Sequence, residues 1–209
     1  MSLLDTSYLS ILLMHAMSSP IMANWYTADT HFGHENVIQF CGRPFRNADH
    51  MDTILIENLW KVVQPDDDLW IVGDFAFGPK AKDTGYVEGL FSQLPGARKH
   101  LIIGNHDLEP TLALPWQSIS HLAEVRDGPH NQAHTLCHYP MITWNHARRQ
   151  ALHMFGHVHN NWAGSRNAVN VGVDQWDFMP VSFDQVAERA RTLPPNAHWS
   201  DVEHGADRA

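Results

Sequence analysis

Cysteine and lysine are both scarce in this sequence of 209 residues. The two cysteines, Cys41 and Cys137, form no CxxC pair and allow at most one disulfide. We therefore expect a reducing, cytoplasmic environment in which both thiols behave as small apolar side chains. Only four lysines are present and the formal net charge is −9, which argues against an extended basic surface for nucleic acid. A local basic pocket or bound cations could still attract a phosphate group.

The sequence also lacks a long hydrophobic run. Residues 8–17 are apolar but too few to span a bilayer, and no lysine or arginine precedes them, as a secretory signal requires. We expect residues 1–21 to be an N-terminal extension outside the fold, with a weak signal peptide as the alternative. Residues 22–195 are predicted to form one domain and residues 196–209 a polar tail. No membrane partner is expected.

Histidine is abundant, with 16 residues, and 44% of the chain is hydrophobic. The first part of the chain alternates strands with helices, whereas the sequence after residue 118 is rich in short strands. Strands are predicted at residues 24–28, 69–72, 101–103, 118–125, 133–137, 151–155 and 168–173. One helix is predicted at residues 49–63, capped by Asp49, another at residues 81–94, and a last one after a capping box that begins at Ser182. The acidic run 66–68 is expected to be a solvated turn.

Polar side chains follow most of the predicted strands at the point where each strand ends. Ligands of open α/β sheets bind beyond the carboxyl ends of strands. Imidazole and oxygen donors together suit a hard to borderline divalent cation. Seven such donors are too many for one tetrahedral site and suit two metals that share a bridging carboxylate. The seven candidate ligands are Asp29, His31, Asp74, Asn105, His138, His157 and His159.

The order of these motifs resembles the calcineurin-like metallophosphoesterase superfamily over residues 24–175. The motifs are Asp-x-His, Gly-Asp, Gly-Asn-His-Asp, His and Gly-His-x-His, and Asp-Thr-His-Phe-Gly-His with a later Arg-Pro-Phe resembles its small bacterial phosphoesterase branch. The resemblance implies a four-layer α/β/β/α sandwich of two mixed sheets flanked by helices, the metallo-dependent phosphatase fold. It implies one metal held by Asp29, His31, Asp74 and His159. It implies a second metal held by Asp74, Asn105, His138 and His157, with Asp74 as the bridge.

Two divalent cations about 3.5–4 Å apart can clamp a phosphoryl group and hold a bridging hydroxide as the nucleophile. Manganese is the expected ion, with iron, zinc, nickel or cobalt as alternatives. His106 follows a candidate ligand and lies outside the predicted ligand set. We expect His106 to be the catalytic residue that stabilises the phosphoryl oxygens or protonates the leaving group.

Two departures from the protein-phosphatase pattern follow Asp74. Phe77 stands where those enzymes carry a carboxylate that orients the catalytic histidine, and Gly78 stands where they carry a phosphate-binding arginine. A phosphoprotein phosphatase is therefore not expected. The orienting partner of His106 stays open, although Asp107 is adjacent in sequence.

Three further residues are candidates for substrate binding. His34 could reach the substrate or be a loop residue, while Arg43 and Arg46 could bind phosphate or be surface arginines beside a turn. Asp174 could line the rim of the site or serve packing. The predicted function is hydrolysis of a small phosphate ester, a diester rather than a monoester. The alternatives are a non-catalytic metal-binding scaffold for protein interaction, or a nuclease.

Overall fold

A computed structural model describes residues 22–202 of the chain. Its centre is two mixed β-sheets, each of five strands within the described range. The predicted N-terminal extension lies outside the described residues, as does the end of the predicted tail from residue 203 onward. Among the described residues, no helix is both long and apolar enough to cross a bilayer.

The first sheet has the strand order β10-β1-β2-β3-β4. Strands β1 to β4 run parallel to one another, and β10 pairs antiparallel with β1. Helices connect the parallel strands, as the alternating pattern of the first part predicts. The strands are β1 (Asn24–Thr27), β2 (Asp68–Val72), β3 (Arg98–Ile102), β4 (Ser118–Ser120) and β10 (Val181–Ser182).

The second sheet has the order β5-β6-β7-β9-β8 and comes from the later part of the chain. Its β5–β6 and β8–β9 pairs are antiparallel, while β6, β7 and β9 run parallel. The strands are β5 (Leu122–Asp127), β6 (Gln132–Cys137), β7 (His153–Phe155), β8 (Gly164–Ser165) and β9 (Ala168–Asn170).

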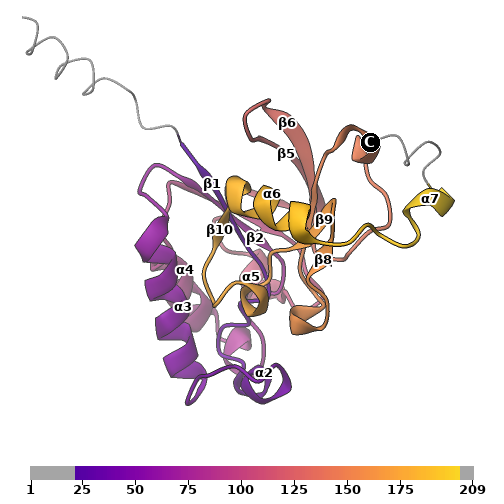
Figure 1. The fold of residues 1–209 in the computed structure, drawn as a ribbon. Helices are drawn as coiled ribbons and strands as arrows, with labels where there is room; N and C mark the ends of the chain where they lie inside the picture. Colours follow the sequence, from indigo (N-terminus) through magenta and orange to yellow (C-terminus); the bar gives the residue numbers. More distant parts are fainter. Residues whose placement is uncertain (1–21, 203–209) are drawn as a thin grey trace, which may run out of the picture.

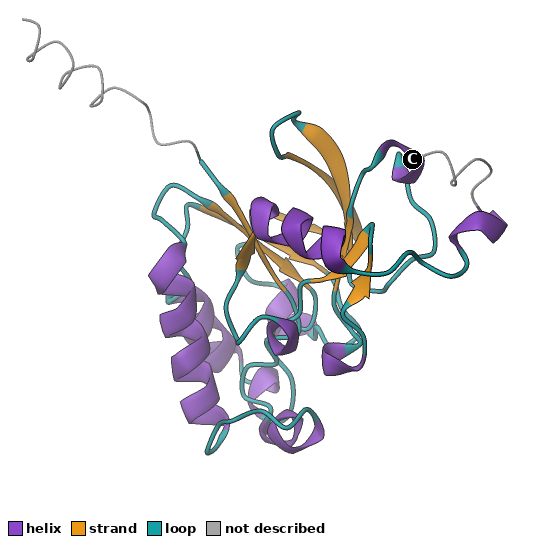
Figure 2. Cartoon of the chain, viewed as in Figure 1, coloured by secondary structure: helices purple, strands orange, loops and turns teal. Residues whose placement is uncertain are grey.

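The six α-helices of the described range lie outside the sheets (Figure 1; Figure 2). In Figure 1, α3 and α4 lie beside the first sheet, whereas α6 lies near β9 and β10. The helices are α2 (Glu35–Phe40), α3 (Ala48–Val62), α4 (Thr84–Ser92), α5 (Glu109–Leu112), α6 (Phe183–Thr192) and α7 (Trp199–Val202).

Alternate residues of β2 enter two different hydrophobic cores. Leu69 and Ile71 pack with α3 and α4 side chains in one core, whereas Val72 packs in a second core that includes residues of the other sheet. Successive strand side chains point to opposite faces, so a strand buried on both faces has an unbroken apolar sequence. This explains why the run 69–72 lacks polar alternation. The molecule is therefore a mixed α/β protein with one core between its sheets.

Several sequence expectations need correction. Residues 118–125 are two strands, because the chain leaves the first sheet after Ser120 and enters the second at Leu122. Asn47, and not Asp49, caps α3, since its side chain accepts the His50 amide. The run 66–68 is not fully solvated. Asp67 is buried and accepts hydrogen bonds from the Ala23 amide and the Trp25 indole.

Other elements agree with the sequence or were not predicted. The capping box of α6 is confirmed, with Ser182 and Gln185 satisfying each other's backbone amides. The short elements α5, β8 and β10 were missed because two to four residues carry no periodic signal. Within the predicted polar tail, α7 forms and the Trp199 ring lies 5.7 Å from that of Trp144.

Candidate metal centre

The candidate ligands converge where the strands of both sheets end. Asp29 follows β1, Asp74 follows β2 and Asn105 follows β3, and these strands are parallel neighbours. From the second sheet, His138 follows β6 and His157 follows β7. The loops are joined by backbone hydrogen bonds, such as that from the Asp29 amide to the Gly73 carbonyl at 3.0 Å. Residues distant in sequence thus share one edge of the fold.

Five of the candidate ligands adopt a left-handed backbone conformation, which is uncommon for residues other than glycine. Such conformations cost free energy and gather at functional sites. Half of the ten described non-glycine residues with a positive φ are therefore predicted ligands. The φ angles are 56° for Asp29, 51° for His31, 57° for Asp74, 71° for His157 and 50° for His159.

Two glycines allow the ligands to approach the backbone closely. A Cβ atom on Gly73 would lie 2.2 Å from His138 Nδ1, and Gly73 itself has a φ of 87°. A Cβ atom on Gly172 would lie 2.6 Å from Asp29 Oδ2. Both distances are shorter than van der Waals contact, so a larger residue at either position would displace a candidate ligand.

The Asp74 carboxylate lies between candidate ligands of the two predicted metals. Its Oδ2 is 3.4 Å from His31 Nε2 and 3.4 Å from His138 Nε2. Donor atoms that surround a tetrahedral cation at about 2.1 Å are separated by about 3.4 Å. Burial raises the pKa of Asp74, but hydrogen bonding and the charges of His138 and His31 outweigh it, so its pKa falls to about 2. The position fits a bridging carboxylate.

Asp29 and His31 carry buried polar atoms that have no hydrogen-bond partner. Asp29 Oδ2 and both ring nitrogens of His31 are buried and form no hydrogen bond within the described residues. Burial raises the pKa of Asp29 to about 6 and lowers that of His31 well below its usual value. Unpaired buried polar atoms are costly, and a divalent cation would satisfy them.

The donor atoms form compact groups that fit a metal ion. Asp29, His31 and His159 offer donor atoms that all lie within 4.8 Å of one another, as do Asp29, Asp74 and His138. Two carboxylates and three imidazoles suit zinc, manganese or iron. The described residues therefore contain candidate sites for divalent metal, with Asp29 common to both groups.

The His138 ring is oriented by a backbone carbonyl, as is common for metal ligands. Its Nδ1 lies 2.9 Å from the Val72 carbonyl, which only accepts, so Nδ1 donates the hydrogen. Its Nε2 lies 3.1 Å from Asn105 Oδ1 and faces Asp74, so this nitrogen is the one that would bind a metal once it is deprotonated. Ligating histidines commonly donate their second ring N–H to a carbonyl or carboxylate.

His159 is oriented by an acidic residue that the sequence reasoning left mainly to packing. Asp174 Oδ2 lies 2.8 Å from His159 Nδ1. Burial lowers the pKa of His159, but this bond and nearby groups outweigh burial and raise the pKa to about 10. Arg43 in turn pairs with both Asp174 oxygens, at 2.7 and 2.8 Å. The chain from Arg43 through Asp174 to His159 fixes the imidazole ring.

Arg43 is neither a surface arginine nor an available phosphate ligand. It is 4% exposed, and its guanidinium donates to Asp174, to the Asp29 and Thr30 carbonyls and toward the Met51 sulfur. All five guanidinium N–H groups are thereby engaged. A partner 131 positions away in the sequence leaves no local signal, which is why the sequence did not reveal this role.

Cys41 also lies closer to the centre than its apolar character suggested. Its side chain packs at the edge of the first core, while its Sγ lies within 4.8 Å of donor atoms of His159 and Asp174. The Asp174 and His159 pair thus has a thiol beside it. The sequence alone did not connect Cys41 with the ligands.

His106 packs against Phe77 and not against a carboxylate. The two ring centroids are 4.0 Å apart and tilted by 46°, and the His106 amide donates to Asp74 Oδ1 at 2.9 Å. Asp107 does not orient His106, because its carboxylate accepts the amides of Asp74, Phe75 and Gly104. Phe77, which stands at the sequence position of the expected orienting carboxylate, instead packs against the His106 ring.

The remaining candidates lie at different distances from the centre. His34 is half-buried with its ring 5.4 Å from that of His31, and burial together with neighbouring positive charge lowers its pKa. The His157 amide donates to Asp29 Oδ1, and its ring lies 5.2 Å from that of His138. Arg46 is exposed on the loop before α3, and no contact joins its guanidinium to the described ligands.

Comparisons with known proteins give relatives of similar length. The Gene 66 protein of Mycobacterium phage D29 is 30% identical over 199 residues, covering 81% of this chain and 96% of that protein. The Gene 66 protein of Mycobacterium phage L5 is 28% identical over 192 residues, covering 78% and 91%. An uncharacterised protein of Methanocaldococcus jannaschii is 28% identical over 163 residues, covering 77% and 87%.

Solved structures of other proteins also align with this chain. A protein of unknown function from Aquifex aeolicus aligns with a TM-score of 0.63 and 26% identity over 80% of this chain and 98% of its own. A Pseudomonas putida chain named nuclease MPE aligns with a TM-score of 0.42 and 19% identity over 65% and 61%, too distantly to bear on function. No protein-family model matches the chain. The likeness to the phage D29 protein is high enough to show that this chain belongs to the family of the mycobacteriophage Gene 66 proteins.

Proposed function

We propose that this chain is a metal-dependent phosphoric ester hydrolase of the calcineurin-like superfamily, with the metallo-dependent phosphatase fold over residues 22–195. The observation that carries the proposal is the position of Asp74 Oδ2, 3.4 Å from both His31 Nε2 and His138 Nε2. The unpaired buried oxygen of Asp29 supports it. The two mixed sheets, with helices outside them, agree with the layered fold that the motif order implies.

The residues of the chain would hold two divalent cations in a fixed frame. One cation would be held by Asp29, His31, Asp74 and His159, and the other by Asp74, Asn105, His138 and His157, with Asp74 shared. When bound, such a pair supplies an activated water and neutralises charge on the phosphoryl oxygens. Manganese is the proposed ion.

His106 is the proposed catalytic residue of the chain itself. Its imidazole is half-exposed beside the ligands and packs against Phe77, while its backbone amide is tied to Asp74. This placement lets it donate a hydrogen bond to a phosphoryl oxygen or a proton to the leaving oxygen. A ring held by packing rather than by a carboxylate keeps both nitrogens available to the substrate.

The proposed substrate is a small phosphodiester. A monoester dianion carries more charge than a diester and usually needs an arginine beside the metals. Arg43 cannot supply that contact because its N–H groups are already engaged within the fold. Arg46 and His34 remain the candidates for substrate contact.

The proposed location of the enzyme is the cytoplasm.

The proposal is tested by hydrolysis of bis-p-nitrophenyl phosphate and p-nitrophenyl phosphate with added Mn²⁺. Asp74→Asn should lower kcat by about 100-fold or more, because the bridging charge is lost. Asp66→Asn changes an exposed carboxylate on a turn and should retain full activity. Full activity of Asp74→Asn would contradict the proposal. Absence of turnover by the wild-type chain with metal bound would favour the non-catalytic scaffold.

A nuclease is the second candidate, and exposed aromatic rings beside the centre favour it. Phe40 is 76% exposed with its ring 6.4 Å from that of His34. Tyr139 is 46% exposed with its ring 4.7 Å from that of His157. Exposed rings on both flanks of a phosphate site can stack on nucleobases. The net charge of −9 favours short single strands over long duplexes.

Cleavage of a short single-stranded oligonucleotide distinguishes this candidate from a general diesterase. Phe40→Ala and Tyr139→Ala should each raise KM for the oligonucleotide by about fivefold or more, since stacking contributes about 1–3 kcal/mol per base. Both variants should leave hydrolysis of bis-p-nitrophenyl phosphate within about twofold of wild type. Equal effects on both substrates would contradict a role in base stacking.

A further inference from the structure

A cavity lies away from the candidate metal centre. It measures about 590 Å³ and is formed by the β5–β6 hairpin, the segment 147–152, the turn between β8 and β9, α6 and the segment 195–199. None of the candidate metal ligands is among its lining residues, all of which belong to the described range. Its volume is within the range of about 300–1,000 Å³ that small-molecule sites occupy.

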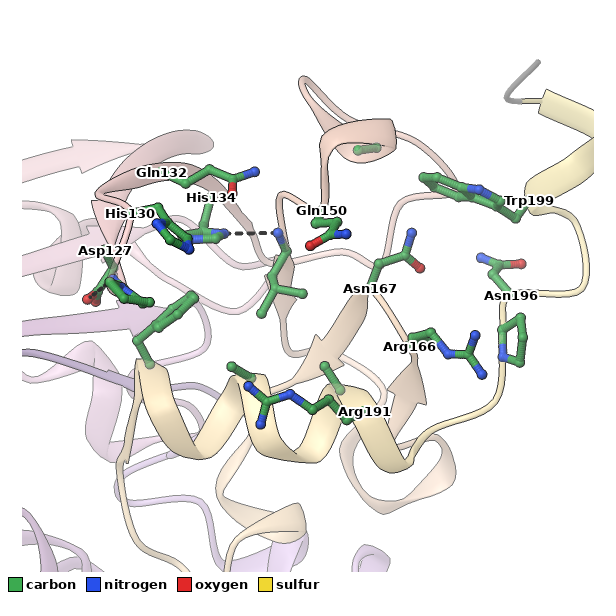
Figure 3. A pocket seen from close by; sticks show the side chains of 18 residues that line it. Asp127, His130, Gln132, His134, Gln150, Arg166, Asn167, Arg191, Asn196 and Trp199 are labelled. Carbon is green, nitrogen blue, oxygen red and sulfur yellow. Dashed lines mark hydrogen bonds between the residues drawn. The ribbon is translucent and has the colours of Figure 1, made fainter. Parts of the chain in front are cut away.

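One wall of the cavity is apolar. Phe183, Ala187 and Ala190 are spaced by four and three residues on α6, so they share one face of that helix, and Leu152 also lines the cavity. The indole of Trp199 adds an aromatic surface at one end, beside Asn196 and Arg166 (Figure 3). The cavity therefore suits the flat or apolar body of a ligand.

The charged groups that line the cavity favour an anion. The Arg166 guanidinium forms no hydrogen bond or ion pair within the described residues, and Arg191 pairs only with the exposed Glu188 on its own helix. Asp127 is the single acidic residue among the described lining residues. Its carboxylate already accepts hydrogen bonds from Tyr26, Asn24 and the Gly128 amide. The cavity is thus locally cationic on a chain of net charge −9.

Amide side chains supply directional hydrogen bonds. Gln150 and Asn167 line the cavity without a side-chain hydrogen bond to any described residue. In Figure 3, both lie between the end with Arg166 and the end with His130. A carboxamide both donates and accepts hydrogen bonds, so it matches the edge of a heterocyclic base, which carries donors and acceptors together. Guanidinium groups match phosphate oxygens.

From these features we propose that the cavity is a non-catalytic binding site for a mononucleotide-type anion. The heterocycle lies on the apolar wall beside the amides, and the phosphate is bound by Arg166 and Arg191. The site is independent of the metal centre. Failure of the cavity to bind the anion would therefore leave the proposed hydrolase activity unaffected, and the reverse also holds.

The test is a titration of the ¹⁵N-labelled full chain with AMP in EDTA, where metal-dependent hydrolysis cannot occur. The indole N–H signal of Trp199, assigned with Trp199→Phe, should shift and saturate. Adenosine and inorganic phosphate, titrated separately, should each bind at least tenfold more weakly than AMP. A saturating response of the ligand-bearing loops without any shift at Trp199 would overturn the proposal, as would no saturable binding at millimolar AMP.

Two variants and a control locate the binding. Arg166→Gln should weaken AMP binding about tenfold or more, because a charge-assisted contact is lost. Ala187→Phe should abolish binding by filling the apolar wall, with thermal unfolding used to verify its fold. Arg126→Gln removes another exposed arginine, on β5 outside the cavity, and should bind AMP as wild type does. Unchanged affinity in Arg166→Gln would contradict the assigned phosphate contact.

Discussion

The candidate ligand residues combine several individually unfavourable features. Asp29 and His31 have left-handed backbones, and both bury polar atoms without hydrogen-bond partners. Each feature costs free energy in the metal-free protein. Features of this kind persist only where the surrounding structure enforces them. Here the enforcing groups are the joined strand-end loops and the pair of Arg43 with Asp174.

Asp174 provides a prediction for a residue that orients a ligand. Asp174→Asn should lower metal affinity by about tenfold or more, because His159 loses the charge that increases its ligand strength. Isothermal titration calorimetry with Mn²⁺ measures this change in metal affinity. Asp177→Asn is the matched control, since Asp177 is exposed and asparagine tolerates its φ of 50°. Wild-type affinity in Asp174→Asn would show that its contact with His159 is irrelevant to metal binding.

At the residue scale, the sequence located the candidate ligands at strand ends but did not reveal the residues that hold them in place. The candidate ligands follow strands, so their positions can be read from local pattern. Arg43 and Asp174 lie 131 positions apart, and neither occupies a recognisable motif. Their pairing follows from the packing of the loops, which no local spacing encodes. The contact of Phe77 with His106 was hidden for the same reason.

At the scale of elements, local signals located most helices and strands but not their ends. α3 has apolar side chains at helical spacing, so its existence was predictable. Its first residue was not, because Asn47 and Asp49 are both acceptable caps. Only the observed hydrogen bond from the His50 amide to Asn47 Oδ1, at 2.9 Å, distinguishes them.

The cap of α3 provides a stability prediction. Asn47→Ala should lower the free energy of unfolding by about 1 kcal/mol, because an amide of the first turn loses its acceptor. Asp49→Ala should have a smaller effect, since its ion pair with Lys80 is exposed. Urea denaturation of both variants measures the difference. A larger loss of unfolding free energy in Asp49→Ala than in Asn47→Ala would show that Asp49 is the residue that stabilises the start of α3.

At the scale of the whole molecule, the two sheets meet where their strand-end loops carry the candidate ligands. The first sheet supplies two carboxylates, an amide and one histidine, and the second supplies three histidines. A cation at this place would link the sheets and neutralise buried charge. Metal binding is therefore expected to stabilise the entire fold and not only one loop.

Thermal unfolding checks this expectation. Mn²⁺ at about 100 times its Kd contributes about 2.7 kcal/mol for one site, which in a domain of this size raises Tm by about 5–10 °C. EDTA should reverse the shift. Asp74→Asn should show little or no shift, because it removes the shared carboxylate. An equal shift in that variant would place the stabilising ion elsewhere.

The sequence by itself determined the alternation of strands and helices, the capping box of α6 and the order of donors at strand ends. These features depend on spacings of a few residues, which secondary structure converts directly into position. Tertiary structure decided where the chain changes sheet after Ser120, which donors share a group, and how Arg43 reaches Asp174. Those outcomes depend on how two sheets pack, and packing joins residues whose separation in sequence carries no periodic signal.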